Sequence, residues 1–402
     1  MRERALRVVL TTESYLPWLS GVTISVDALA RGLGARGHEV MVVAPRPAKR
    51  AEVKAVGSPG PAPSYAWLDS YQLPRLAPAG YRMAWPNPAD AAWKAARAFD
   101  PDVVHAHSPF VTGMLARNLA RRVGAPLVFT HHTRFADYGH YLGPLARPGS
   151  FLTDAYLRRF WAGCGAIIAP SAGLAAEIGD RLPPSQRGRV HVIPTGIDIA
   201  AIRALDPVDP GPAHDWPADA VVVATLGRLA PEKSPEVILD AFAELAEGAP
   251  DARLLVIGGG PSEASLRARA AAADLAGRVA FTGSLPRVEA LARLAGADLF
   301  AFASRTETQG LVLAEALAAG LPAVAIEGPG VADSVRDGVD GTIVAAEPAA
   351  TRTDRLAEAM RELLADDGRR KEIAARAAAG ADRFAVDARV AEVEGVYRSL
   401  LG

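Results

Sequence analysis

Two glutamates that stand eight positions apart, Glu307 and Glu315, are the residues of this chain best placed to do chemistry. Gly310 lies between them and opens a predicted helix over 311–319, so Glu315 falls about one and a half turns into that helix. The start of a helix presents free N–H groups and a positive dipole end, which suit a phosphate. Carboxylates on either side can hold hydroxyl groups of a sugar and of a ribose. Taken alone, the spacing favours an ordinary helix with a second glutamate on its polar face.

Two cations, Arg228 and Lys233, stand five positions apart in the run Gly-Arg-Leu-Ala-Pro-Glu-Lys. The run follows a predicted strand over 221–226, at the end of the strand where parallel sheets bind ligands. Two cations on one loop can clamp a diphosphate and neutralise the charge of a departing nucleotide. The alternative is a solvated loop with ordinary surface charges. The glutamate pair in the same half of the chain favours the binding role.

Glycines follow another predicted strand of the second half, in the run Gly258-Gly259-Gly260. Glycine allows the backbone to approach a ligand closely and to adopt positive φ. The run is not a Gly-x-Gly-x-x-Gly motif and lies in the second half, so a dinucleotide-dependent oxidoreductase is disfavoured. Ser284 ends the next strand, where a plain turn is an almost equally good interpretation for any single side chain.

Histidines mark the ends of two predicted strands in the first half. His132, in His-His-Thr, can as a neutral imidazole hydrogen-bond a sugar and stabilise positive charge at its anomeric carbon. His105 and His107 point the same way on a strand, but no third metal ligand is evident, so we expect a structural role for them. Asp100-Pro-Asp102 precedes its strand, at the wrong end of the sheet for a metal site.

Taken together, these motifs resemble the retaining glycosyltransferases of the GT-B fold, specifically glycosyltransferase family 4. The resemblance runs from Thr12 to about Val344, and the ordered set of motifs is far more specific than each motif. It implies an α/β fold of two doubly wound, Rossmann-like domains that face a cleft. The domains are expected at 1–196, which binds the acceptor, and 197–384, which binds the nucleotide sugar. The helix at about 385–402 is expected to pack back on the first.

The resemblance also implies roles for individual residues. Arg228 and Lys233 bind the donor phosphates, and His132 is the active-site histidine because it directly precedes the threonine. Glu307 is assigned to the sugar. The expected donor-binding residues are Gly21, Gly258, Gly259, Ser284, Gly310, Leu311, Val312 and Glu315. Ser20 stands where many members have a second glycine, which leaves the shape of the Gly21 loop open.

The resemblance implies that the configuration at the anomeric carbon is retained. We expect this because the acceptor attacks the same face of the sugar from which the nucleotide departs. Glu307 and Glu315 are too closely tied to the donor to act as the nucleophile and acid of a hydrolase. The leaving phosphate, held by the two cations, accepts the proton of the acceptor. No metal or other cofactor is expected.

The substrates are narrowed by the run Asp-Tyr-Gly-His-Tyr, residues 137–141, which looks like the subset that glycosylates diacylglycerol and related lipids. The leading interpretation is transfer of a hexose from UDP-glucose to a lipid hydroxyl such as that of diacylglycerol. The alternative within enzymes is a GDP-mannose-dependent mannosyltransferase acting on a phosphoinositide or glycolipid. Alternatives of other classes are a nucleotide-sugar epimerase and a non-catalytic nucleotide-binding protein at a membrane.

Length, cysteine content and the distribution of apolar residues limit the number of domains and the class of protein. A length of 402 residues, half of them hydrophobic, fits two domains. The single cysteine, Cys164, excludes a disulfide framework and suits a reducing cytosol. The apolar start at 7–12 is predicted as a strand and not a signal peptide, because Glu13 follows without a cleavage site. No apolar run approaches the 18 residues of a membrane span.

Charge divides unequally between the two halves. Residues 1–196 hold 23 Lys and Arg against 13 Asp and Glu, and residues 197–402 hold 21 against 32. No nucleic-acid-binding signature accompanies the basic half, so an anionic membrane surface is the better partner, with drift in surface charge an equal alternative. We therefore expect a cytoplasmic protein attached peripherally to the inner face of the membrane. The expected contacts are Arg117, Arg121, Arg122 and the run 156–161, whose aromatic rings favour the head-group level. The alternative for Phe160 and Trp161 is that they are core residues of a helix.

Strand-like and helical patterns alternate along the chain, as in doubly wound parallel sheets. The segment 45–90 is rich in proline and alanine and poorly periodic, and is expected to be a long excursion between a strand and a helix. The interdomain linker is expected at about 195–215. The predicted strands are 7–12, 39–44, 103–107, 127–131, 166–169, 221–226, 254–257, 279–282, 299–303 and 322–326. The predicted helices are 25–36, 235–247, 262–273, 288–296, 311–319 and 385–401.

Overall fold

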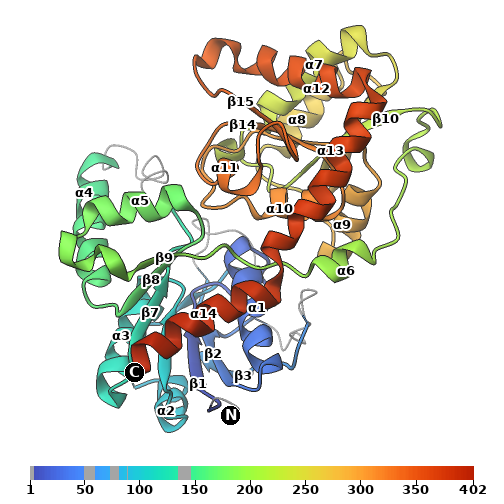
Figure 1. Cartoon of the computed structure of the whole chain (residues 1–402). Helices are drawn as coiled ribbons and strands as arrows, with labels where there is room; N and C mark the ends of the chain where they lie inside the picture. The colour runs from blue at the N-terminus through green and yellow to red at the C-terminus, as the bar shows by residue number, and fades with distance from the viewer. Residues whose placement is uncertain (1–3, 49–58, 73–80, 88, 135–145) are drawn as a thin grey trace. The chain divides into compact units, whose positions relative to one another are not determined.

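A computed structural model describes residues 4–48, 59–72, 81–87, 89–134 and 146–402. The chain forms two compact units (Figure 1). The first comprises Met1–Ile197 and Val386–Gly402, and the second comprises Asp198–Ala385. The division falls beside the boundary expected between 196 and 197, and the C-terminal helix belongs to the first unit.

In the described residues of the first unit, a seven-stranded parallel sheet has the strand order β3-β2-β1-β6-β7-β8-β9. Its central strands are short runs of Val, Ile and Leu buried on both faces, as expected for a parallel sheet covered on both sides. The order reverses between β1 and β6, and ligands bind outside the carboxyl ends of strands at such a point. The strands are β1 Arg7–Thr11, β2 Glu39–Pro45, β3 Ser64–Leu68, β6 Val103–Ala106, β7 Leu127–Thr130, β8 Ala166–Ala169 and β9 Val190–Val192.

The helices of the first unit include one from each end of the chain. Helix α1 begins at Gly21, before the predicted start at Ser25, because the Ser20 side chain caps it by accepting a hydrogen bond from the Thr23 N–H. Helix α14 packs on α1, and a Cβ on Gly32 would lie 2.6 Å from Val390, so glycine permits this approach. The helices are α1 Gly21–Ala35, α2 Ala91–Ala98, α3 Val111–Val123, α4 Ala146–Trp161, α5 Ala172–Arg181 and α14 Val386–Leu401.

The segment 45–90 is more regular than its composition indicates. Strand β3 pairs in parallel with β2 and extends the main sheet, and β4 (Ser70–Tyr71) pairs antiparallel with β5 (Met83–Ala84). Tyr15, in the loop after β1, packs on Tyr65 and on Trp67 with ring centroids 6.0 and 6.5 Å away, so aromatic contacts hold β3 against the rest of the unit. The segment lies between a strand and a helix, β2 and α2, as predicted, but it contains a strand over Ser64–Leu68 that was not predicted.

The second unit is described in full, and its six-stranded parallel sheet has the order β12-β11-β10-β13-β14-β15. The order again reverses beside the first strand of the unit, between β10 and β13. Its strands are β10 Val221–Leu226, β11 Ala252–Ile257, β12 Val279–Gly283, β13 Leu299–Phe302, β14 Ala323–Ile326 and β15 Gly341–Val344. Its helices are α6 Ile199–Arg203, α7 Pro235–Gly248, α8 Glu263–Ala270, α9 Arg287–Ala295, α10 Leu311–Ala318, α11 Val331–Ser334, α12 Arg352–Ala365 and α13 Asp367–Gly380.

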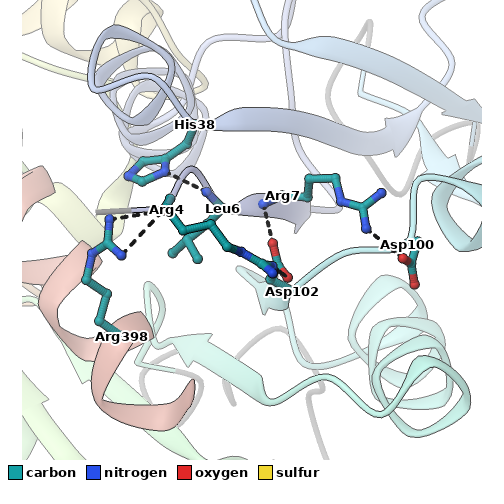
Figure 2. Close-up of polar contacts among 7 residues, drawn as sticks. All are labelled: Arg4, Leu6, Arg7, His38, Asp100, Asp102 and Arg398. Atoms are coloured by element: carbon teal, nitrogen blue, oxygen red, sulfur yellow. Dashed lines mark hydrogen bonds and ion pairs between the residues drawn. The ribbon is translucent and has the colours of Figure 1, made fainter. Parts of the chain in front are cut away.

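The Asp-x-Asp run lies at the amino end of the first sheet and is held by arginines (Figure 2). Asp102 accepts a hydrogen bond from the Arg7 N–H at 2.7 Å and is also paired with Arg4. Asp100 is paired with the Arg7 guanidinium at 2.6 Å. The two aspartates therefore tie β1 to the start of β6, which confirms that they stand at the wrong end of the sheet for catalysis.

The aromatic residues expected to meet a membrane lie instead in the core. Phe160 and Trp161 are only 2% and 1% exposed, because the face of α4 that carries them packs on the first sheet. The prediction that they anchor the chain in lipid head groups was therefore wrong. Among the described residues, no helix is long and apolar enough to cross a membrane.

Candidate active site

Loops that follow three neighbouring strands of the second unit pack backbone to backbone. The Gly258 N–H donates to the Gly283 carbonyl at 3.1 Å, and the Leu229 N–H donates to the Gly259 carbonyl at 3.1 Å. A Cβ on Gly258 would lie 2.0 Å from the Gly227 carbonyl oxygen, so only glycine allows this approach. The three glycine-containing motifs of the second half therefore meet at the carboxyl ends of β10, β11 and β12.

Ser284 and Gly259, both predicted to bind the donor, are direct neighbours. A Cβ on Gly259 would lie 2.5 Å from the Ser284 hydroxyl oxygen. Because Gly259 has no side chain, the Ser284 hydroxyl can lie close to the backbone of the glycine run. The pair presents a hydroxyl and backbone polar groups in one small area, which suits hydrogen bonds to a planar base.

Lys233 and Glu307, the predicted phosphate and sugar ligands, form an ion pair with 2.5 Å between the Lys233 Nζ and a Glu307 carboxylate oxygen. The Thr306 hydroxyl donates to the Glu232 carbonyl at 3.1 Å and joins the same two loops. Arg228 lies 3.9 Å from the Glu232 carboxylate, and its side chain is 52% exposed. The site therefore combines one cation fixed by a carboxylate with a second that is open to solvent.

Gly310 adopts φ +75°, a left-handed conformation that favours glycine, and α10 begins immediately after it. Within this fully described unit, the helix start has no side-chain cap, so the first N–H groups of α10, at Leu311 and Val312, are not covered by one. Gly330 packs against this loop, and a Cβ there would lie 2.7 Å from the Gln309 Cα. Sequence reasoning missed Gly330. Its positive φ shows that it lies in a tight turn.

Glu315 is buried inside α10 and is paired with Arg287 at the start of α9. Their side chains are 4% and 16% exposed, so each charge depends on the other for compensation. Sequence reasoning did not identify Arg287. The preceding Pro286 marks a helix start, and an arginine there was a signal that could have drawn attention to it.

In the first unit, His132 is hydrogen-bonded to another histidine. His107 Nδ1 lies 2.9 Å from His132 Nε2, and the His105 and His107 rings stack with centroids 4.2 Å apart. His105 is in turn bonded to the Tyr397 hydroxyl at 2.6 Å and to the Thr130 hydroxyl at 2.7 Å. The structural role expected of His105 fits these contacts. The contact of His107 with the predicted active-site residue was not predicted from the sequence.

Burial keeps these imidazoles uncharged. It lowers the pKa of His132 to about 4. Burial, together with the nearby His132, lowers the pKa of His105 and of His131 to about 3. It also holds the pKa of His107 well below its ordinary value. Each neutral ring has one donor and one acceptor nitrogen, so the bond between His107 and His132 links the tautomers of the two.

A pocket of about 290 Å³ opens at the loop after β1. Glu13, Trp18, Tyr81 and Arg82 are among its lining residues. Burial raises the pKa of Glu13, although its carboxylate accepts a hydrogen bond from the Thr112 N–H, and burial raises the pKa of Tyr81 to about 12. Sequence reasoning missed this largely apolar pocket.

The remaining predictions concern Gly21, the run 137–141 and metal binding. Gly21 is the first residue of α1, and no described atom lies within 4 Å of the position of a Cβ on it. Asp137, Tyr138 and His140, which narrowed the substrate class, lie outside the described residues. Among the described residues, no group of three or more His, Cys, Asp or Glu is arranged to hold a metal ion.

Comparison with known proteins agrees with this architecture. The family described as Glycosyltransferase Family 4 matches residues 19–201, and the family described as Glycosyl transferases group 1 matches residues 212–379. An alpha-monoglucosyldiacylglycerol synthase from Acholeplasma laidlawii is 30% identical over 335 residues, which cover 79% of this chain and 80% of the relative. A GDP-mannose-dependent alpha-mannosyltransferase from Mycobacterium tuberculosis is 29% identical over 366 residues, which cover 89% of this chain and 88% of the relative.

Among solved structures, HepE from Anabaena in complex with UDP and glucose matches with a TM-score of 0.73 at 18% identity. The match covers 98% of this chain and 100% of that chain and shows the shared fold. The chain therefore belongs to glycosyltransferase family 4. It is a glycosyltransferase with the GT-B fold, in which each unit is a parallel-sheet α/β domain.

Proposed function

We propose that the chain is a retaining hexosyltransferase that moves glucose from UDP-glucose to a lipid hydroxyl such as that of diacylglycerol. The observation that carries this proposal is the meeting of the glycine loops with the Lys233–Glu307 pair and the start of α10 in one unit. The name of the Acholeplasma laidlawii relative supports the choice of sugar and acceptor.

In this proposal the second unit holds the donor. Arg228 and Lys233, with the N–H groups of Leu311 and Val312, bind the diphosphate, and Glu307 binds the sugar. The loops of Gly258, Gly259 and Ser284 contact the base, and Glu315 contacts the ribose with Arg287 as its counter-ion. Because Lys233 already contacts Glu307, a phosphate bound to the lysine would bring its sugar beside the carboxylate.

In the reaction we propose, the bond between the anomeric carbon and the phosphate oxygen breaks. The acceptor oxygen bonds to the same face of the anomeric carbon and gives its proton to the departing phosphate. Arg228 and Lys233 neutralise the charge that develops on that phosphate. We assign His132 to the transferred sugar, where a neutral imidazole tolerates positive charge at the anomeric carbon better than an imidazolium. The pocket beside Glu13 is our candidate for the acceptor, and no metal is required.

The alternative donor is GDP-mannose, as the name of the Mycobacterium tuberculosis relative illustrates. Purified protein incubated with UDP-glucose, UDP-galactose or GDP-mannose, together with diacylglycerol or lipid extract, separates the possibilities by mass spectrometry and NMR of the product. We expect an α-linked glucolipid. An α-mannolipid from GDP-mannose would support the alternative, and a β-linked product would contradict retention. Conversion of a nucleotide sugar without any acceptor would indicate an epimerase.

We also propose that the chain is cytoplasmic and attaches peripherally to an anionic membrane through its first unit. The excess of ten positive charges over residues 1–196 supports this, since basic residues near such a surface contribute about 1 kcal/mol each. Exposed apolar side chains on α3 and α4 supply a second attraction. Phe151 and Leu152 on α4 are 73% and 67% exposed.

A further inference from the structure

A pocket of about 540 Å³ in the first unit lies apart from the residues assigned to the reaction and is lined by five arginines. We call it the arginine pocket. Two of the arginines come from the C-terminal half of α3 and two from the end of α4, and the fifth ends α5. They are Arg117, Arg121, Arg158, Arg159 and Arg181.

Positive charge in the arginine pocket is only partly compensated. Asp154 pairs with Arg158 at 2.7 Å and with Arg181 at 3.4 Å. Arg117, Arg121 and Arg159 form no ion pair with any described residue. Five arginines against one aspartate leave an excess of four positive charges around one concavity, which is a strong attraction for a polyvalent anion.

Arg117 lines the pocket and packs against Gly163. A Cβ on Gly163 would lie 3.1 Å from the Arg117 Nε, so the guanidinium rests against the backbone where a side chain is missing. This Nε is buried and has no hydrogen-bond partner among the described residues. A buried donor without a partner is costly, and a phosphate oxygen is the kind of acceptor that guanidinium groups bind best.

The four arginines of α3 and α4 follow exposed apolar residues at a fixed spacing. Phe110 and Met114 stand seven positions before Arg117 and Arg121, and Phe151 and Leu152 stand seven positions before Arg158 and Arg159. Seven residues are about two helical turns, so Met114, Phe151 and Leu152 each lie on the same helix face as their arginine, about 10 Å away. Phe110 is the residue directly before α3. We call these four apolar side chains the apolar row; they are 37%, 50%, 73% and 67% exposed, in the same order.

The two helices run in the same direction, so their apolar ends lie on the same side. The Phe110 ring stacks on Tyr156 at 5.9 Å, and further along the pair Gly113 faces Phe160 and Arg117 faces Gly163. Side chains that insert into lipid and arginines at the depth of the phosphates are the arrangement found in interfacial proteins. A soluble phosphate compound would have no use for the apolar row.

We infer that the arginine pocket is a discrete site for the phosphate of an anionic lipid head group, which the apolar row positions at the membrane surface. The inference deepens the membrane part of the proposed function and is independent of the donor and the acceptor. It differs from diffuse attraction because it assigns the attachment to particular arginines, so arginines of equal charge outside the pocket contribute little.

The chain provides a matched control for this distinction. Arg97 is exposed on α2, and Arg187 is exposed in the short 3-10 helix Pro184–Arg189 that follows α5; neither lines the pocket. The pocket variant carries Arg121→Gln with Arg159→Gln, and the control carries Arg97→Gln with Arg187→Gln. Both lose two positive charges from the first unit.

Sedimentation with phosphatidylcholine vesicles, with and without phosphatidylglycerol, measures the affinity of each protein at low and high salt. We expect the pocket variant to bind the anionic vesicles at least about tenfold more weakly than the wild type, and the control to stay within about threefold. Equal weakening of both variants would overturn the inference in favour of diffuse charge. Unchanged binding by the pocket variant would overturn it as well.

Titration with glycerol 1-phosphate separates a lipid from a soluble phosphate. Weak, saturable binding that is lost in the pocket variant, together with weakened vesicle binding, supports the inference. Tight binding of glycerol 1-phosphate with no effect on vesicles would assign the pocket to a soluble phosphate compound and overturn the lipid assignment. UDP affinity serves as the folding control, and a failure of glycosyl transfer would leave these binding results unaffected.

Discussion

The second unit gathers charged side chains where the first unit gathers neutral ones. At the strand ends of the second unit, Lys233 pairs with Glu307 and Glu315 pairs with Arg287. At the strand ends of the first, His132 and His107 are bonded to one another and burial keeps both uncharged. The contrast matches a division of labour in which the second unit binds an anionic donor and the first tolerates developing positive charge on the sugar.

The largest effect is expected from Glu307→Ala, which removes the carboxylate assigned to the sugar. Transfer should fall by about 10²- to 10³-fold, the usual cost of losing a stabilising group in the transition state. Affinity for UDP should change by less than about threefold, because losing a negative charge beside Lys233 does not oppose an anion. Steady-state kinetics and calorimetry with UDP measure the two quantities.

Glu315→Ala should show the opposite profile, with weakened UDP binding, because it removes the proposed ribose ligand and leaves Arg287 unpaired. Equal losses of UDP affinity in the Glu307 and Glu315 variants would contradict the assignment of one to the sugar and the other to the ribose.

Removing either cation of the donor site should weaken UDP binding. Charge-assisted hydrogen bonds contribute about 1.5–3 kcal/mol, so Arg228→Ala and Lys233→Ala should each lower the affinity by about 10- to 100-fold. Arg376→Ala, which breaks an exposed pair with Glu372 in the same unit, is the control and should bind UDP like the wild type. The donor-site assignment fails if the two cation variants also bind as the wild type does.

A smaller effect is expected from His107, which acts through His132. His107→Ala should slow transfer by about tenfold, the equivalent of one hydrogen bond of about 1.4 kcal/mol, with UDP affinity unchanged. His107→Asn keeps polar atoms near the position of Nδ1 and should recover part of the rate. If alanine and asparagine variants slow the reaction equally and also unfold at lower temperature, His107 serves only stability.

The neutral histidine cluster predicts a pH dependence of stability. The pKa of His132 is lower in the folded chain than in the unfolded chain, so the unfolded chain binds more protons below about pH 6.5. The free energy of unfolding should therefore fall as the pH falls, for His132 by on the order of 1 kcal/mol between pH 7 and pH 6. Glu13, whose pKa is raised, acts in the opposite direction. The midpoint of urea unfolding, measured at pH 7 and at pH 6, checks this. Equal midpoints at the two pH values would contradict the burial of neutral histidines.

The central strands of the two sheets were the elements of this chain that could best be predicted from the sequence. Runs such as 221–226 and 166–169 are short and apolar, each has a glycine at one end, and their lengths match the structure. Strand β3 was missed because its alternating Tyr65, Ala66 and Trp67 stand within a segment dominated by proline and alanine.

Partners that come from distant parts of the chain could not be predicted from one sequence. Arg287 and Glu315 meet only because α9 and α10 pack together, and Tyr397 reaches His105 because α14 returns to the first unit. The buried face of α4 could be read from the sequence, since Leu157, Phe160 and Trp161 recur at helical spacing, and this period favours the core alternative for the two aromatic rings.

The most direct test of the division between the units is calorimetric titration of UDP into His132→Ala and Lys233→Ala, with transfer measured on the same preparations. The account predicts that His132→Ala binds UDP like the wild type while losing most transfer, and that Lys233→Ala loses affinity as well as transfer. A loss of UDP affinity in His132→Ala equal to that in Lys233→Ala, or full transfer by His132→Ala, would contradict it.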